Sequence, residues 1–465
     1  MARGKKAAKE LSPEEKLQQA LVPVEEQPYP IPENWCWVRL SSLSVVISKG
    51  TTPVGGKNAY VDEGINFLRV ENINEDGNIS HDGIAHITES LHTGCLKRSI
   101  LLERDILISI AGTLGKTGIV RKIDLPLNTN QAIAFVRLSF HEINELYIKN
   151  AIDCPMLQKY LLDKTKVTSI PNLTLEIVGN CPIPFPPLPE QHRIVSRIES
   201  LFAKLGEAKE KAQAVVDGFE LRKSAILHKA FTGELTERWR KEYGVGMESW
   251  EPRKLKDCGD WYGGGTPSMA HPEYWDNGDL LWITSKDMKS DIIEDTLLRT
   301  NMAGVSNSSA NYIEKPSILF VMRSGILRRT LPISMVKIPF TVNQDLKAIS
   351  PVNDLDLEYF FWVCKSLEKS MLGTCMKNGT TVESINTKAL MEFKIPIASQ
   401  PEQKEIVSCI DSLLAKEQQA KEVAEAVLSQ IDTMKKAILA RAFRGELGTN
   451  DPAEESAAEL IKTVL

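Results

Sequence analysis

The sequence predicts an α+β protein in which two similar mixed domains are separated by two long helices that form an antiparallel coiled coil. Three observations lead to this prediction. The chain has 465 residues, which is more than one ordinary core accommodates. A segment returns after a shift of 212 residues, from Glu190 to Glu402, and each copy carries an apolar heptad pattern.

The repeat is closest in the segments that we expect to be helical. Pro189-Glu190-Gln191 returns as Pro401-Glu402-Gln403, and Phe231-Thr232-Gly233 returns as Phe443-Arg444-Gly445. No insertion separates these matches. Upstream the likeness is looser, and it pairs Trp35 with Trp250, Thr52-Pro53 with Thr266-Pro267, and Asn130-Gln131 with Asn343-Gln344. The two halves therefore share a scaffold but differ in surface.

Each helical copy has apolar residues at alternating steps of three and four, which is typical of a coiled-coil seam. Each helix is predicted to span roughly 37 residues, or about 55 Å, starting after a proline-rich stretch and ending near Gly233 or Gly445. The second seam is broken only at Glu417. We expect the two helices to pair; the alternative is that each packs on its own domain. The seam residues are Ile194, Ile198, Leu201, Leu205, Val215 and Phe219 in the first copy, and Ile406, Ile410, Leu413, Val427, Ile431 and Ile438 in the second.

The predicted order of parts follows from these patterns. Short apolar runs between turn residues predict strands, with helices over Glu145 to Lys164 and Leu357 to Leu372. Leu17 to Leu21 leading to Trp35 faintly repeats the end of the first long helix leading to Trp250, which indicates a short helix near the end of the second long helix; the alternative is a loose basic tail. The expected parts are a tail (1–34), domain 1 (35–188), a first helix (189–235), a linker (236–249), domain 2 (250–396), a second helix (397–447) and a tail (448–465).

Composition limits the function classes. The apolar content of 42% and the charged content of 25% are those of a globular protein. No run of about 18 apolar residues occurs, so we expect a cytoplasmic protein with no membrane contact. The eight cysteines are spaced singly, which indicates reduced and mostly buried thiols. The net charge of −5 argues against a protein that binds nucleic acid without partners. Any DNA-binding role therefore requires partner subunits to supply part of the phosphate contacts.

Turn motifs give a more specific indication. Ser48-Lys49-Gly50-Thr51-Thr52-Pro53 and Gly263-Gly264-Gly265-Thr266-Pro267-Ser268 resemble the Gly-Gly-Thr-Pro turn found early in the target recognition domains of Type I restriction-modification specificity subunits. The resemblance continues through the strands at Gly64 to Val70 and Gly278 to Thr284, and ends in the Pro-x-Glu-Gln helix entry. It covers nearly the whole chain twice. The second domain departs from the family pattern around Arg323 to Thr330, where no Gly-Lys turn appears.

This resemblance implies a non-catalytic, DNA-binding subunit of a restriction system used in phage defence. Each domain would read a few base pairs of a bipartite double-stranded DNA target, and the helices would fix the gap between them. Two methyltransferase subunits, which bind S-adenosylmethionine and methylate adenine, would dock on the helices. Two restriction/translocase subunits, which use ATP and Mg, would complete the complex. The resemblance implies no cofactor and no metal in this chain.

Candidate DNA contacts are polar residues in the glycine-rich turns, where the backbone can approach DNA and an Arg or amide can reach a base edge. A solvated surface side chain is the alternative for each of them. Arg328-Arg329 is the strongest pair. The candidates are Lys49, Thr51, Arg69, Asn72 and Lys116 in domain 1, and Thr266, Lys286, Lys289, Arg323, Arg328 and Arg329 in domain 2.

Other functions find less support. Gly112 to Thr117 suggests a phosphate-binding loop, but that loop needs a glycine at position 110, which is Ile110, so we expect a β-turn. No methyltransferase motif and no His spacing typical of metal catalysis occurs, which leaves a stand-alone methyltransferase unsupported. The main alternative is a structural adaptor whose helices organise a protein complex. The two helical segments are closely similar in sequence, whereas the two domains have diverged. This combination favours a protein that recognises two unrelated half-sites.

Overall fold

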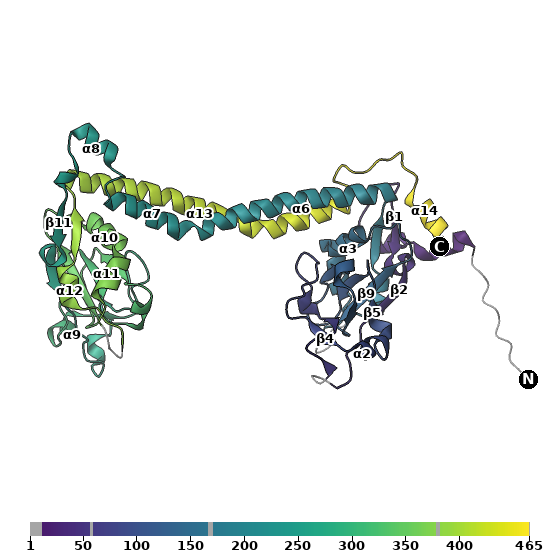
Figure 1. The fold of residues 1–465 in the computed structure, drawn as a ribbon, viewed down its shortest axis with the longest axis horizontal. Helices are drawn as coiled ribbons and strands as arrows, with labels where there is room; N and C mark the ends of the chain where they lie inside the picture. Colours follow the sequence, from purple (N-terminus) through teal and green to yellow (C-terminus); the bar gives the residue numbers. More distant parts are fainter. Residues whose placement is uncertain (1–11, 56–58, 166–170, 378–381, 465) are drawn as a thin grey trace, which may run out of the picture. The chain divides into compact units, whose positions relative to one another are not determined.

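The computed structural model describes residues 12–55, 59–165, 171–377 and 382–464, so the basic stretch Met1 to Glu10 lies outside the described residues. The chain divides into two compact units. Unit 1 comprises Met1–Lys211 and Val427–Leu465, and unit 2 comprises Ala212–Ala426. Each unit therefore holds one mixed domain together with parts of both long helices (Figure 1). Over the described ranges, none of the helices has the length and apolar character needed to cross a bilayer.

Domain 1 is built from two four-stranded sheets and one strand pair. The first sheet is antiparallel throughout, whereas the second contains the parallel pair β3 and β8. The strand orders are β2 (Ser44–Lys49), β9 (Ile133–Leu138), β6 (Ile106–Ser109), β7 (Thr117–Ile119); β4 (Ala85–Ile87), β3 (Ile65–Leu68), β8 (Leu127–Thr129), β5 (Ile100–Leu101); and β1 (Cys36–Arg39), β10 (Pro182–Phe185).

Domain 2 repeats this plan. A four-stranded antiparallel sheet lies beside a smaller sheet with one parallel pair, β13 and β17, and a separate antiparallel pair joins the two ends of the domain. The mixed α+β class predicted for both halves is confirmed. The strand orders are β12 (Gly259–Tyr262), β18 (Leu346–Pro351), β15 (Ser317–Val321), β16 (Ile333–Val336); β14 (Arg299–Thr300), β13 (Leu280–Ile283), β17 (Phe340–Val342); and β11 (Glu251–Lys254), β19 (Lys394–Ile397).

Two domain helices that the sequence predicted as continuous are each divided. The first is split into α3 (Glu145–Asp153) and α4 (Pro155–Asp163), because Pro155 has no N–H with which to continue α3. The second is split at Leu367 into α10 (Leu357–Ser366) and α11 (Glu368–Cys375). Tyr147 and Tyr359, on α3 and α10, are fully buried and donate equivalent hydrogen bonds to the carbonyls of Pro184 and Pro396.

The long helices also differ from the prediction of two equal rods. The first is interrupted at Gly218 and forms α6 (Leu188–Asp217, 30 residues) and α7 (Phe219–Phe231, 13 residues). The second, α13 (Gln400–Ala442), runs for 43 residues. At the interruption Arg222 donates from Nη2 to the carbonyl of Val215 at 2.7 Å and from Nε to Glu417 at 2.6 Å. The pairing with Arg222 explains why a carboxylate replaces an apolar seam residue at position 417.

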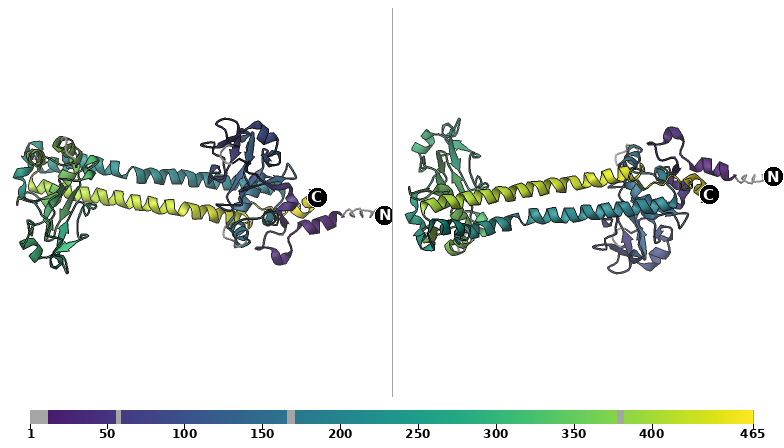
Figure 2. Two further views of the ribbon diagram at one scale, coloured as in Figure 1. Left: turned by 90° about the horizontal axis from the view of Figure 1, so that it is seen from below. Right: turned by 90° about the horizontal axis from the view of Figure 1, so that it is seen from above.

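The two helices pair in antiparallel fashion within each unit. In unit 1 the start of α6 shares a core with the end of α13, through Ile194, Ile198 and Leu439. In unit 2 the start of α13 shares a core with the end of α7, through Ile406 and Leu227. Both views of Figure 2 show the helices side by side. The predicted coiled coil is confirmed. The alternative, in which each helix packs only on its own domain, is not what the structure shows.

Seam burial varies along the helices. Ile194, Ile198, Ile406, Ile410 and Ile431 are buried. Val427 was predicted as a buried seam residue, but it is 36% exposed. A helix covered by a single partner leaves the flanks of each seam side chain open to water, so residues away from the domains are less buried than residues near them. The remaining seam positions, Leu201, Leu205, Val215, Phe219, Leu413 and Ile438, are half-buried.

The short helix expected before Trp35 is present as α1 (Pro13–Ala20), which begins with a capping box formed by Ser12 and Glu15. It packs beside α14 (Ala457–Val464). Ala20 belongs to the same core as Phe443, near the end of α13, so the N-terminal segment lies where the sequence repeat placed it. The linker of unit 2 contains α8 (Glu237–Tyr243), a helix that the sequence analysis did not anticipate.

The Pro-x-Glu-Gln motif joins each domain to the start of a long helix. Glu190 accepts a hydrogen bond from the Trp35 indole at 2.7 Å, and Glu402 accepts one from the Trp250 indole at 2.8 Å. Both carboxylates are fully buried. Burial raises the pKa of Glu190, an effect opposed by the indole hydrogen bond and by nearby Arg193. The motif is therefore structural, and it fixes the orientation of each domain on the helix that follows it.

Candidate nucleic-acid interface

One edge of domain 1 gathers its polar turns. β3 and β8 run parallel and end at the same edge, where Asn130 N donates to Leu68 O at 3.4 Å. The turn after β2 joins them through a 3.1 Å bond from Thr51 N to Thr129 O. The hairpin turn after β6 is tied in by Ile110 N, which donates to Ala132 O at 2.8 Å. We call residues 50–53, 69–72, 110–116 and 130–132 the turn edge of domain 1.

Domain 2 has an equivalent turn edge, formed by residues 263–267, 284–289, 322–330 and 343–345. The corresponding backbone bonds recur, from Asn343 N to Ile283 O at 3.0 Å and from Gly265 N to Val342 O at 3.0 Å. Met322 N donates to Asp345 O at 2.7 Å and holds the root of the 322–330 loop against this edge. The looser sequence repeat thus corresponds to a shared backbone arrangement.

A side-chain contact between two motifs stabilises each turn edge. Thr266 Oγ1 donates to Gln344 Oε1 at 2.7 Å, and Thr52 makes the same contact with Gln131. The sequence analysis aligned these motifs but named only Thr266 as a candidate contact. A Cβ atom at Gly264 would overlap the carbonyl oxygen of Val342, so the close approach of the two turns requires glycine there.

Four of the domain 1 candidates lie at or beside the turn edge. Lys49 is exposed at the end of β2, and Thr51 is half-buried in the following turn. The Arg69 guanidinium lies 4.8 Å from the centre of the Tyr60 ring and 3.7 Å from Glu71. Lys116 is half-buried at the end of the hairpin turn. Three cationic side chains are therefore brought to one edge.

Asn72 is a correction. The sequence analysis proposed it as a DNA contact, but its side chain is only 5% exposed. Asn72 Oδ1 accepts a hydrogen bond from Arg69 N at 3.1 Å, just as Asp287 accepts one from Thr284 N at 2.8 Å in domain 2. Both residues close the turn after a parallel strand, because a short polar side chain readily bonds to nearby backbone N–H groups. Asn72 is therefore a turn-closing residue.

The segment that suggested a phosphate-binding loop is a hairpin turn. It joins the antiparallel strands β6 and β7, and no helix follows it. Ser109 closes the turn, because its Oγ accepts a hydrogen bond from Lys116 N at 2.8 Å. Lys116 also borders a cleft of about 670 Å³ that is lined by residues of α3, α6 and α13, including Lys149, Phe202 and Lys435.

The loop where the sequence departs from the family pattern joins β15 and β16, the strands equivalent to β6 and β7. It is basic: Arg323, Arg328 and Arg329 are exposed, and Arg328 Nε donates a hydrogen bond to Glu383. Lys286 and Lys289 are exposed on the turn after β13, and Thr266 is exposed in the glycine-rich turn. All six domain 2 candidates therefore lie on the turn edge.

Sequence reasoning missed two residues beside this loop. Glu383 and Lys377 are far from Arg323 in the sequence, but a backbone bridge between Arg323 and Ser384 brings their segment to it. Lys377 N donates to Ser384 O at 2.9 Å. No local sequence signal marks either residue, because a bridge between distant segments is not visible in a pattern of neighbours.

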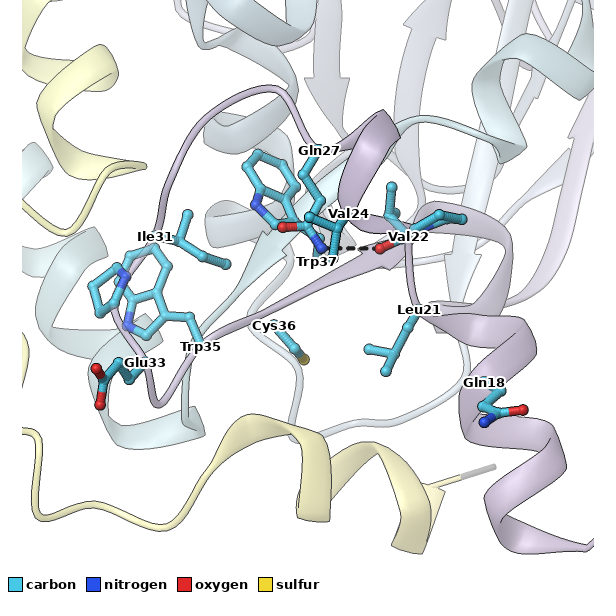
Figure 3. A pocket seen from close by; sticks show the side chains of 12 residues that line it. Gln18, Leu21, Val22, Val24, Gln27, Ile31, Glu33, Trp35, Cys36 and Trp37 are labelled. Atoms are coloured by element: carbon cyan, nitrogen blue, oxygen red, sulfur yellow. Dashed lines mark hydrogen bonds between the residues drawn. The ribbon is translucent and has the colours of Figure 1, made fainter.

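A second hollow lies away from the turn edges. A hollow of about 490 Å³ lies beside the N-terminal segment and is lined by Leu21, Val22, Trp35 and Cys36. Gln27 Nε2 donates a hydrogen bond to Val22 O at 3.0 Å. Figure 3 shows these side chains and this hydrogen bond. Burial raises the pKa of the Cys36 thiol to about 12, so this thiol stays protonated. Among the residues that the structure describes, no group of three His, Cys, Asp or Glu side chains could hold a metal ion.

Fold and site together define a class: two related domains, each with a polar and largely cationic turn edge, joined by an antiparallel helix pair. The family model described as the Type I restriction modification DNA specificity domain matches residues 32–215 and 247–426. The chain belongs to this family.

Several relatives agree with the assignment, and solved structures share the fold. The specificity subunit of the Type I restriction enzyme EcoR124I/EcoR124II of Escherichia coli is 35% identical over 201 residues, which is 41% of this chain and 49% of the relative. The chain thus spans about half the length of the first relatives that it matches. The MjaVIII specificity subunit of Methanocaldococcus jannaschii is 25% identical over 90% of this chain and 94% of its own length. The HsdS subunit of Thermoanaerobacter tengcongensis shares the fold, with a TM-score of 0.65 and 18% identity over 91% of this chain and 100% of that one.

Proposed function

We propose that the chain is the non-catalytic DNA-reading subunit of a Type I restriction-modification complex. The observation that carries the proposal is the recurrence of one scaffold with two different turn edges. Both domains keep the same backbone bonds and the same Thr–Gln contact, whereas the loops beyond these contacts differ in length and charge. This combination suits a protein that reads two unrelated half-sites.

Charge supports a direct role in DNA contact and also a dependence on partners. The turn edges present Lys49, Arg69 and Lys116 in domain 1 and a larger basic set in domain 2, and such side chains bind phosphates and guanine edges. The chain as a whole carries a net charge of −5, so the turn edges are local exceptions. Partner subunits supply the remaining phosphate contacts.

Family membership supports the partners that we propose. Two methyltransferase subunits, which carry S-adenosylmethionine, dock on the helices and methylate an adenine in each half-site. Two restriction/translocase subunits supply ATP- and Mg-dependent cleavage. The complex acts in the cytoplasm on double-stranded DNA. A structural adaptor without DNA contact is not favoured, because it gives no reason for the two turn edges to be kept open and cationic.

The test is to map methylated adenines in cells that express the chain with its partner subunits. We expect a split motif with an unread gap. Exchanging residues 250–396 for the matching segment of a relative should change one half of the motif only, and lengthening both helices by one heptad should widen the gap. As a control, alanine substitutions on the exposed face of α8 should leave the motif unchanged. A change in both halves, or in neither, would refute independent reading by the two domains.

A further inference from the structure

Arg328 is an exposed arginine whose guanidinium is nevertheless held. It lies at the end of a single turn of helix in the loop between β15 and β16. Its side chain is 70% exposed, yet Nε donates a hydrogen bond to the carboxylate of Glu383, whose side chain is only 21% exposed. An exposed arginine without such a partner samples many rotamers, and ordering it costs conformational entropy. Contact with Glu383 reduces that freedom before any ligand binds.

The carboxylate comes from a fixed segment. Ser324 N donates to Glu383 O at 3.1 Å, Ile385 N donates to Met322 O at 2.8 Å, and Arg323 forms a bridge with Ser384. The hydrogen bond from Arg328 holds the pKa of Glu383 below its usual value, and a backbone N–H adds to this effect. Glu383 is therefore ionised at neutral pH, and the contact is a charge-assisted one.

The atom through which Arg328 is held determines what the rest of the side chain can do. A guanidinium presents five N–H donors in one plane. A carboxylate on Nε engages one side of that plane and leaves the donors of Nη1 and Nη2 for a ligand, on a side chain that is 70% exposed. Two parallel donors at this spacing match O6 and N7 of guanine in the major groove, which is the commonest specific contact between a side chain and a base.

We propose that Arg328 reads a guanine in the half-site recognised by domain 2 and that Glu383 is the positioning residue that fixes its orientation. This inference rests on the proposed function. Arg323 and Arg329, exposed on either side of Arg328 in the same loop, bind the phosphates that flank the base. The root of this loop is bonded to Asp345, so Arg328 is placed at the turn edge.

The experiment uses the full complex of the chain with its partner subunits and duplexes that carry the mapped motif. Each guanine of the domain 2 half-site is replaced in turn by 7-deazaguanine, which lacks the N7 acceptor. We expect one position at which the replacement weakens binding by wild-type complex roughly 5- to 150-fold, the range of a good bidentate contact. At that position the replacement should have little further effect on the Arg328→Lys complex, because lysine keeps the charge but not the two parallel donors.

Glu383 is tested by Glu383→Ala and Glu383→Gln. Alanine should lose discrimination at that same guanine while leaving the other half-site and the salt dependence of binding unchanged. Glutamine, which still accepts a hydrogen bond from Nε, should recover part of the discrimination. Lys315→Arg is the matched control, because Lys315 is an exposed cation of domain 2 that pairs with Asp260 outside the turn edge, and this variant should keep the full preference for guanine.

Two results would overturn the inference. One is a uniform loss of affinity of Arg328→Lys on all sequences, which is the behaviour of a phosphate contact. The other is a domain 2 half-site in which no guanine is sensitive to 7-deaza substitution. Absence of any split motif in the wild-type complex would instead refute the proposed function, so the two failures are distinguishable.

Discussion

Replacing Phe443 by alanine should unfold the part of domain 1 that packs on the end of α13. Phe443 follows α13 and is far from that domain in the sequence. Its side chain is fully buried, and its ring lies 5.3 Å from that of Tyr147 at a steep angle. A buried Phe→Ala change costs about 3–5 kcal/mol of folding stability. An aromatic pair of this geometry contributes about 0.5–1.5 kcal/mol beyond the stabilisation that its buried area provides. We therefore expect a loss of at least about 3 kcal/mol from the stability of unit 1.

Hydrogen exchange resolved by peptide is the suitable assay, because a chain with two units has no single unfolding midpoint. A loss of about 3 kcal/mol corresponds to a rate increase of roughly 100-fold or more for the slowest amides of α3 and β10. Phe231→Ala is the matched control. Phe231 occupies the equivalent position, and the centre of its ring lies 5.5 Å from the centre of the Tyr359 ring, so this variant should accelerate exchange in domain 2 only.

The reasoning is refuted if Phe443→Ala accelerates exchange in domain 2 while domain 1 stays protected. That result would mean that the end of α13 packs on the other domain, as it would in a parallel pair of helices. Met434→Ala provides a baseline, because Met434 is 43% exposed on the same helix and should change neither domain.

Two further predictions concern unit 2. The side chains of Arg222 and Glu417 are 35% and 25% exposed, so Arg222→Met and Glu417→Leu should each destabilise the helix pair. The double variant should recover most of the loss, with a coupling of about 1–2 kcal/mol measured by hydrogen exchange in α7 and α13; simple additivity would contradict this. Burial alone would raise the pKa of Asp291, but the ammonium groups of Lys223 and Lys365 lower it overall. A carboxylate whose pKa is depressed in the folded state stabilises that state at pH values above the unfolded pKa of about 3.9, and this stabilisation is lost as the pH falls through the folded-state pKa. Contact between α7 and domain 2 should therefore loosen below about pH 4 in hydrogen-exchange measurements. The Asp291→Asn variant should lack this acid step.

The fold was predictable where the sequence repeats itself. Heptad spacing identified both helices, and the match of Phe231 with Phe443 indicated equivalent ends. The interruption at Gly218 was not predictable, because a glycine within a helix is tolerated as often as it breaks one. Glu417 was visible as a defect in the seam, but its partner Arg222 lies on the other helix and becomes evident only when the pairing register is known.

The candidate site was partly predictable for a similar reason. Glycine-rich turns after strands are marked by local sequence, so Lys49, Arg69 and Thr266 could be named in advance. Asn72 was misassigned because the same amide that can bind adenine can also close a turn, and spacing does not separate the two uses. Glu383 was missed because its proximity to Arg328 depends on a bridge between segments distant in the chain.

The shared core of domain 1 and the end of α13 has a consequence for synthesis. That core includes Leu439, Phe443, Ala457 and Ile461, which leave the ribosome only after the whole of domain 2 has been made. At about 5–20 residues per second, the delay is on the order of 10 to 50 seconds. During this interval domain 1 stays unfinished, with apolar surface open to water and to chaperones, and it is completed after the domain that follows it.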